Sequence, residues 1–145
     1  MDGKQLAVGP WDPVKTFEGH EDTIFAIAAF PDGKRIVTGS VDKTIRIWRL
    51  EDGREMKKWA VEKRIHALVI LRNRKHVVSP EEDSPEDSDK TEYWQVYVRD
   101  ADTRRVTVVA GPFKSHGHTN AVLTLDISPD SGILASGSLD GTIIL

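Results

Sequence analysis

Two sets of residues in the sequence combine an imidazole, a hydroxyl and a carboxylate at the same spacing. The members are His20, Thr38 and Asp42 in the first set, and His118, Ser136 and Asp140 in the second. An imidazole has two distinct nitrogens, so it can bridge a hydroxyl and a carboxylate, as it does in nucleophilic catalysis. An active site is normally unique, however, whereas this set occurs twice. We therefore interpret the two sets as structural and expect no enzymatic activity, with a hydrolase as the least favoured alternative.

Both sets belong to longer segments that repeat in register. Residues 19–48 read GHEDTIFAIAAFPDGKRIVTGSVDKTIRIW, and residues 117–145 read GHTNAVLTLDISPDSGILASGSLDGTIIL. An offset of 98 residues relates Pro31 to Pro129, Gly39 to Gly137 and Thr44 to Thr142. Self-similarity at a fixed spacing is the signature of repeat architectures, so it governs the fold prediction.

The first copy is predicted to form four short antiparallel strands with a tight turn between each pair. The predicted strands are 23–30, 35–40, 44–48 and 55–61, with a further short strand at 14–18. Residues 23–30 are apolar on both faces, which predicts a strand buried between two layers. Gly39 inside a strand is unfavourable unless another group must approach its backbone closely.

A degraded copy occupies the middle of the chain. Its strands are expected at 64–71, from 76, at 95–99 and at 105–110, with Val98 at the position of Trp48. Residues 80–92 are expected to form a solvated acidic loop, because acidic residues and two prolines dominate them. The acidic members are Glu81, Glu82, Asp83, Glu86, Asp87, Asp89 and Glu92.

The Gly-His starts and the segments TGSVDKTIRIW and SGSLDGTIIL resemble the WD40 repeat of β-propellers, over residues 14–145. The resemblance implies an all-β fold of about three four-stranded antiparallel WD40-type blades, a partial propeller or one ring-forming segment. The expected parts are a leader at 1–13, blade one at 19–61, a degenerate blade two at 62–110 and an incomplete blade three at 117–145. The third copy stops one residue before the tryptophan that the repeat predicts.

The same resemblance implies a buried hydrogen-bonded tetrad in each intact repeat. In blade one it would comprise His20, Thr38, Asp42 and Trp48, and in blade three the incomplete set of His118, Ser136 and Asp140. Removing one member would leave buried polar groups unpaired. The middle copy has none of these residues at matching positions, so we expect blade two to be the least stable.

The resemblance further implies a protein–protein interaction scaffold, with a sensor or regulatory segment excised from a larger signalling protein as the alternative. Loops before the first strands are expected to share one face. The candidate partner-binding residues there are Glu21, Asp22, Thr23, Arg64, His66, Thr119 and Asn120. The acidic loop is expected on the same side, where it would steer a basic partner. A tolerated surface insertion is the alternative interpretation of this loop.

Composition excludes several classes of function. The 145 residues carry a net charge of −3 with scattered basic residues, which argues against a nucleic-acid surface. The absence of cysteine excludes disulfides and thiolate sites, and no cofactor or metal site is expected. No stretch resembles a signal peptide or a membrane span, so a cytoplasmic location is expected, with the nucleus as the alternative.

A three-blade arc would leave two apolar faces open. Two explanations follow from the sequence. Either the chain is part of a longer protein, or two chains associate head to tail as a homo-oligomer that completes a six-bladed ring.

Overall fold

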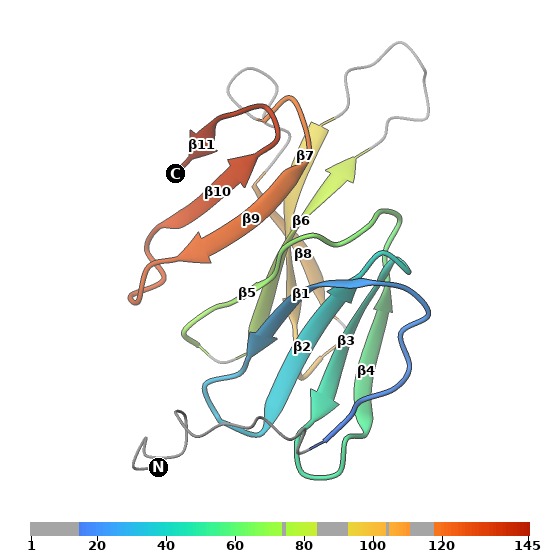
Figure 1. Ribbon diagram of the computed structural model, residues 1–145. Helices are drawn as coiled ribbons and strands as arrows, with labels where there is room; N and C mark the ends of the chain where they lie inside the picture. Colours follow the sequence, from blue (N-terminus) through green and yellow to red (C-terminus); the bar gives the residue numbers. More distant parts are fainter. Residues whose placement is uncertain (1–14, 74, 84–92, 104, 111–117) are drawn as a thin grey trace, which may run out of the picture.

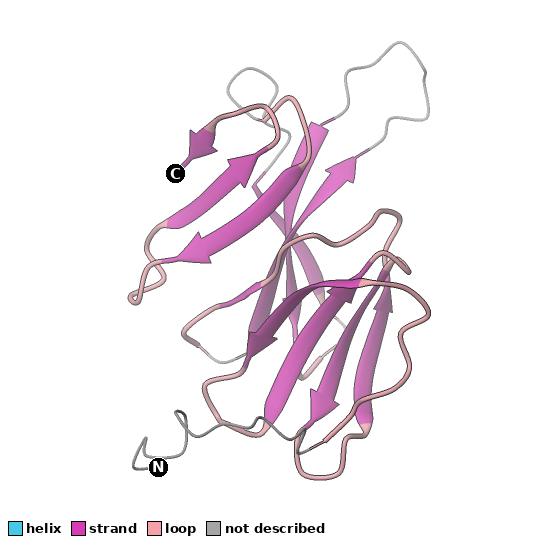
Figure 2. Cartoon of the chain, in the orientation of Figure 1, coloured by secondary structure: helices cyan, strands magenta, loops and turns pink. Residues whose placement is uncertain are grey.

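A computed structural model of the chain describes residues 15–73, 75–83, 93–103, 105–110 and 118–145. All regular structure in these residues is β-strand, and the strands form three antiparallel sheets (Figure 2). Each sheet corresponds to one copy of the repeat and is called a blade here. The all-β prediction is confirmed.

Blade one is a four-stranded meander in the order β1-β2-β3-β4. Its strands are β1 (Ile24–Ala29), β2 (Arg35–Ser40), β3 (Thr44–Arg49) and β4 (Glu55–Ala60). The turns follow from local chemistry: Gly33 and Gly53 adopt φ of 67° and 73°, which glycine tolerates without strain. Lys43 adopts φ of 61° between β2 and β3, beside a carboxylate of Asp42 that accepts the Thr44 backbone N–H.

Blade two is a second four-stranded sheet, in the order β5-β6-β7-β8. Its strands are β5 (Val69–Ile70), β6 (His76–Asp83), β7 (Tyr93–Asp100) and β8 (Val106–Ala110). The first strand is thus shorter than the predicted 64–71. The prediction of a loop from residue 80 is wrong for 80–83, because β6 continues through them and pairs residue for residue with β7. The rest of the acidic segment, residues 84–92, lies outside the described residues.

Blade three contains three strands in its described part, in the order β11-β10-β9. They are β9 (Val122–Ile127), β10 (Leu134–Ser138) and β11 (Ile143–Ile144). The register repeats that of blade one: Gly137 lies opposite Ile143, as Gly39 lies opposite Ile45.

Blade two lies between the other two blades, since β5 contacts both β1 and β9 (Figure 1). The largest core cluster fills the junction between blades one and two. Its buried members are Ala26, Phe30, Val37, Ile45, Ile47, Ile65, Leu68, Val77 and Ala101. We call the face of a blade that packs on the next blade its trailing face, and the opposite face its leading face. Gly39 lies on the trailing face of blade one, and a Cβ there would collide with Ile65 of blade two. The predicted close approach at Gly39 is confirmed.

Strand β1 is buried on one face only, so the prediction of two buried faces is wrong. Ala26 is 8% exposed and Phe30 2%, but Phe25 and Ile27 are 55% and 66% exposed. The described chain places a layer only against the trailing face of blade one. A β-bulge between Ile24 and Ala26 also turns Ile24 to the leading face, opposite Ser40 rather than Val41.

The strand predicted at 14–18 is absent from its described part, residues 15–18. This segment crosses the turn between β3 and β4, where the Lys15 ammonium donates to the Leu50 carbonyl at 2.7 Å. The Phe17 ring packs edge-on against Trp48. A strand needs a neighbouring backbone edge, and here the turn engages side chains instead.

Candidate functional site

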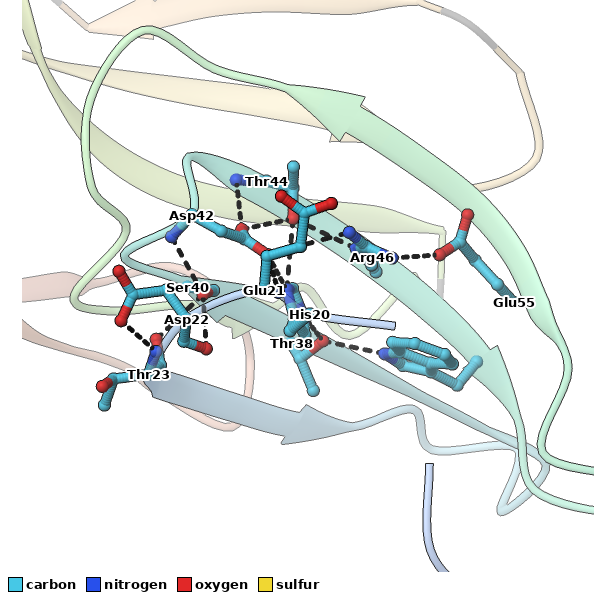
Figure 3. A network of polar contacts seen from close by, with 11 residues as sticks. His20, Glu21, Asp22, Thr23, Thr38, Ser40, Asp42, Thr44, Arg46 and Glu55 are labelled. Carbon is cyan, nitrogen blue, oxygen red and sulfur yellow. Dashed lines mark hydrogen bonds and ion pairs between the residues drawn. The ribbon is translucent and has the colours of Figure 1, made fainter. Parts of the chain in front are cut away.

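A chain of four side chains connects the strands of blade one (Figure 3). The His20 Nδ1 atom lies 2.7 Å from Asp42 Oδ2, and His20 Nε2 lies 2.6 Å from Thr38 Oγ1. The Trp48 indole N–H donates to the same Thr38 oxygen at 2.8 Å. The chain therefore joins the loop before β1 to β2, to the β2–β3 turn and to β3.

In a neutral His20 ring, the partners fix the direction of each hydrogen bond among these four side chains. A carboxylate only accepts, so His20 donates from Nδ1 to Asp42, and in the neutral ring Nε2 becomes an acceptor. Thr38 then donates its hydroxyl hydrogen to His20 while accepting from Trp48.

Asp42 collects more hydrogen bonds than any other member of the network. Burial would raise the pKa of Asp42, but hydrogen bonds from Thr44, His20 and the Glu21 N–H hold it well below its usual range. The Thr44 hydroxyl donates at 2.6 Å and the Glu21 backbone N–H at 3.1 Å. The carboxylate is therefore charged throughout the ordinary pH range.

Arg46 and Glu55, which the sequence did not single out, extend the network together with Ser40 at the β2–β3 turn. Arg46 is buried, and its guanidinium donates to Glu55 at 2.8 Å and to Thr44 Oγ1 at 3.2 Å. Ser40 donates to the Thr23 carbonyl at 2.8 Å and accepts from the Asp42 N–H, which ties the turn to the loop before β1. An alternating pattern predicts Arg46 as solvent-facing, so only the neighbouring Asp42 hinted at its role.

Gly19 makes room for the network. Its φ is 152°, and a Cβ there would come within 2.8 Å of the Arg46 guanidinium and 2.9 Å of the Trp48 ring. The Gly-His pair is therefore needed together, since a side chain at the glycine would collide with the Arg46 and Trp48 side chains of the network.

Blade three repeats the arrangement without the tryptophan. His118 Nε2 lies 2.8 Å from Ser136 Oγ, and His118 Nδ1 lies 3.3 Å from Asp140 Oδ2. Hydrogen bonding from Thr142, together with the Thr119 and Thr142 N–H groups, keeps the pKa of Asp140 well below its usual range despite the desolvation that opposes it. Both sets thus have the same atomic connectivity.

Blade two holds a different polar cluster at the same positions. The predictions of which residues match Trp48 and Thr38 are wrong. The turn hydrogen bonds Leu50 N–H to Lys34 and Ala101 N–H to Lys75 are equivalent, so Arg99 rather than Val98 matches Trp48. By the same register, Ser79 matches Thr38, so the middle copy does retain one hydroxyl. Sequence alone does not show which residues of β6 and β7 pair, because the acidic segment separates the two strands.

In this cluster Arg99 replaces the indole. Its guanidinium donates to Ser79 Oγ at 2.8 Å and forms an ion pair of 2.5 Å with Glu81. The Ser79 hydroxyl donates to the same Glu81 oxygen at 2.8 Å. All three are buried, so Glu81 belongs to a buried charge pair between β6 and β7 of blade two and not to a solvated loop.

The His–hydroxyl–carboxylate connectivity matches that of a catalytic triad, but the surroundings differ. The Thr38 side chain is 4% exposed and its oxygen is occupied by both His20 and Trp48. A nucleophile must be accessible to its substrate, and Thr38 is not. The geometry in blade one therefore serves cohesion between strands.

Comparison with known proteins decides the family. The sequence profile described as "WD domain, G-beta repeat" matches residues 11–49 and 111–145, just over half of the chain. The chain is a member of the WD40 repeat family. The two matched segments contain the two His–hydroxyl–carboxylate sets, whereas the Arg99 cluster lies between them.

Several curated proteins match a part of this chain. Protein groucho of Drosophila melanogaster is 38% identical over 55 residues, which is 38% of this chain and 8% of the relative. The guanine nucleotide-binding protein subunit beta of Zea mays is 39% identical over 34% of this chain and 13% of its own length. Transcriptional repressor tup12 of Schizosaccharomyces pombe is 50% identical over 23% of this chain and 6% of its own. The matches thus cover only a small part of these relatives, whose names differ in function.

The candidate partner-binding residues lie around one end of the WD40 blades. All except His66 are exposed: Glu21, Asp22 and Thr23 before β1, Arg64 before β5, and Thr119 and Asn120 before β9. His66 is half-buried, because its ring packs on Phe25 with 5.1 Å between centroids. Desolvation, with a contribution from the Arg64 charge, lowers the pKa of His66.

A hollow opens where the first segments of the three WD40 repeats converge. Its lining is Phe25, Ala26, Ile27, His66, Ala67, Leu68, Leu123, Thr124 and Leu125. Sequence reasoning named His66 but missed Phe25 and Leu123, which the equivalence of first-strand positions would have grouped with it. Among the described residues, no group of three His, Asp or Glu side chains could hold a metal ion, and no helix is long and apolar enough to span a membrane.

Proposed function

We propose that the chain is a protein-interaction module without catalytic activity, which binds a peptide or loop of another protein in the hollow between its first strands. One observation carries the proposal: the hollow exposes apolar side chains from separate repeats, next to a neutral imidazole. Phe25 is 55% exposed and Leu123 40%, on either side of His66. Exposed apolar surface of this kind, rimmed by polar residues, is typical of interaction sites.

The rim supplies hydrogen-bonding and charged groups of both signs. The exposed residues before the first strands are Glu21 and Asp22 in blade one, Arg64 in blade two, and Thr119 and Asn120 in blade three. A peptide that inserts an aromatic or aliphatic side chain beside Phe25 could therefore pair its backbone or flanking charges with the rim.

The test is a selection from a displayed random peptide library, followed by affinity measurement on variants. We expect Phe25→Glu and Leu123→Glu each to weaken the selected peptides by about tenfold or more, because a charge in the hollow loses the apolar contact. Val106→Glu is the matched control, since Val106 is 46% exposed on the outer strand β8. Peptides that bind all three variants equally would contradict the proposed site.

The preference for a basic partner stays a separate prediction. Glu81 cannot contribute to it, because Arg99 already neutralises its charge. Steering would rest on the other acidic residues of the segment, which are Glu82, Asp83, Glu86, Asp87, Asp89 and Glu92. Reversing these charges should slow association of a basic peptide at low salt and have little effect at high salt. An unchanged association rate at low salt would exclude steering. A cytoplasmic or nuclear location is likewise proposed and is tested by imaging a tagged chain.

A further inference from the structure

The contact between blades one and two is a side chain of one blade seated over a glycine of the other. Ile65 of blade two is fully buried and occupies the space that a Cβ on Gly39 would fill, and Leu68 borders the same space. Gly39 lies on the trailing face of blade one, and Ile65 and Leu68 lie on the leading face of blade two. We call this arrangement, an aliphatic side chain of one blade packed over a glycine of its neighbour, the glycine seat.

Equivalent positions in the three repeats follow from one hydrogen bond at the end of each first strand. Phe30 N–H donates to Arg35, Leu71 N–H to His76, and Ser128 N–H to Ile133. Counting back six residues from each donor makes Ile24, Ile65 and Val122 equivalent. All three are β-branched aliphatic residues, although the blades differ elsewhere.

These equivalent side chains differ in what covers them. Ile65 is 0% exposed, because it packs over Gly39 of the blade before it, and Val122 is 2% exposed. Ile24 is 47% exposed, since the described chain places no blade against the leading face of blade one. Ile24 therefore has the position of Ile65 in a junction, but no glycine of a neighbouring blade covers it in the described chain.

The other half is present at the opposite end of the row of blades (Figure 1). Gly137 is equivalent to Gly39, and a Cβ there would meet only the Thr124 methyl of its own blade. The neighbouring Ile143 is 78% exposed, whereas its equivalent Ile45 is fully buried. A hollow lined by Thr124, Gly137 and Ile143 lies where blade one receives Ile65.

We propose that two copies of this chain associate head to tail, with Ile24 of one copy seated over Gly137 of the other. The two open faces match the two halves of a junction that already exists inside the chain, an aliphatic side chain and a glycine seat. The contact is heterologous, because different surfaces of the two copies meet. Two such contacts between two copies close a ring of six blades, within the range that propellers adopt.

Association is tested with the whole chain by size-exclusion chromatography with light scattering. The wild type should reach about 32 kDa, twice the 16.2 kDa of one chain. Ile24→Lys and Ile143→Glu should each shift the chain to the monomer mass, because each places a charge in an apolar junction. Val106→Lys and Val106→Glu are the matched controls and should keep the wild-type mass. Thermal unfolding shows whether each variant is folded.

Mixing the two variants separates head-to-tail association from other geometries. A mixture of Ile24→Lys with Ile143→Glu restores one unaltered junction and sets lysine near glutamate at the second, so the dimer should return. A face-to-face dimer would bury only one of the two surfaces, so one of the two single variants would keep the wild-type mass. A wild type that stays monomeric at the highest soluble concentration, or a mixture that stays monomeric, would overturn the proposal.

Crosslinking gives an independent readout, because the chain has no cysteine. Thr124→Cys places a thiol at the edge of the Gly137 seat, and Ile24→Cys places one on the projecting side chain. Under mild oxidation the mixture of these two variants should form the heterodimeric disulfide within minutes. Ile24→Cys mixed with Val106→Cys should form much less. Equal yields in both mixtures would overturn the proposed seat.

Discussion

Blades one and two solve the same packing problem with different chemistry. At the position where Trp48 donates a neutral indole hydrogen to Thr38, blade two has Arg99, which donates to Ser79 and pairs with Glu81. Both clusters are buried and both tie the second strand to the third. One is held by a histidine from the loop before the first strand, and the other needs no contribution from that loop.

This difference explains how a repeat can lose its recognisable residues and keep its blade. A buried charge pair satisfies the same hydroxyl as the indole, but it carries the desolvation cost of two ions. One donor in it also stays unsatisfied: Arg99 Nε is the one buried side-chain polar atom without a hydrogen-bond partner among the described residues. The substitute cluster is therefore complete in connectivity and inferior in hydrogen bonding.

The largest expected effect comes from breaking the charge pair of blade two. Arg99→Ala should lower the free energy of unfolding by about 3–5 kcal/mol, because it strands a buried carboxylate. The double variant Arg99→Met/Glu81→Leu should be close to the wild type, since apolar residues need no partner. Urea denaturation measures both, with Arg105→Ala, an exposed arginine, as the control. Equal losses in the single and double variants would show that the charges do not act as a pair.

Removing the carboxylate of blade one should cost somewhat less. Asp42→Ala leaves the His20 ring, the Thr44 hydroxyl and two backbone N–H groups without an acceptor, so we expect a loss of about 3 kcal/mol. Asp52→Ala, in the exposed β3–β4 turn, is the matched control and should lose under about 1 kcal/mol. Similar losses for the two variants in urea titrations would show that Asp42 stabilises only its own turn and not the hydrogen-bond network.

Protonating Asp42 should act in the same direction through pH. Its folded-state pKa lies below the unfolded value of about 3.9, so its stabilisation is present above about pH 4 and is lost as pH falls further. Other aspartates shift too, so the quantity to measure is the difference in stability between wild type and Asp42→Asn. That difference should shrink from about pH 5 to about pH 2. A constant difference would contradict the assigned charge.

The smallest effect is expected from the indole hydrogen. Trp48→Phe keeps the ring and loses one donor, while Thr38 keeps His20, so the loss should be about 1 kcal/mol. Trp59→Phe is the control, because the Trp59 indole makes no hydrogen bond in the described part of the chain and its ring is half-buried against the core cluster. Trp48→Phe as stable as Trp59→Phe would mean that blade one depends on packing and not on the donor.

The sequence predicted the strands of blade one well because local signals agree there. Glycine and aspartate turns bound each strand, and Gly39 correctly indicated a close contact. It failed for β1, where apolar residues on both faces predicted two covering layers. The bulge at Phe25 and the absence of a layer against the leading face are tertiary facts that no alternation pattern contains.

Blade two was read less well for a different reason. Acidic residues and prolines after Ser79 suggested a loop, but Glu81 has a partner eighteen residues away in Arg99, which keeps the strand paired. A charged residue is predicted to be solvent-exposed when the sequence does not show which residue of opposite charge it pairs with. The candidate site suffered similarly, since Phe25 and Leu123 became neighbours of His66 only through the arrangement of three first segments.

The span of the blade one network has a consequence for synthesis. Its hydrogen bonds join residues between His20 and Glu55, with none to a later blade among the contacts of its described side chains. Contacts this local close quickly and need little chain. Since chains emerge from the ribosome N-terminus first, blade one can be complete while blade two is still being made. The trailing face around Gly39 would then already be folded when Ile65 is synthesised, so that blade one provides the surface on which blade two folds.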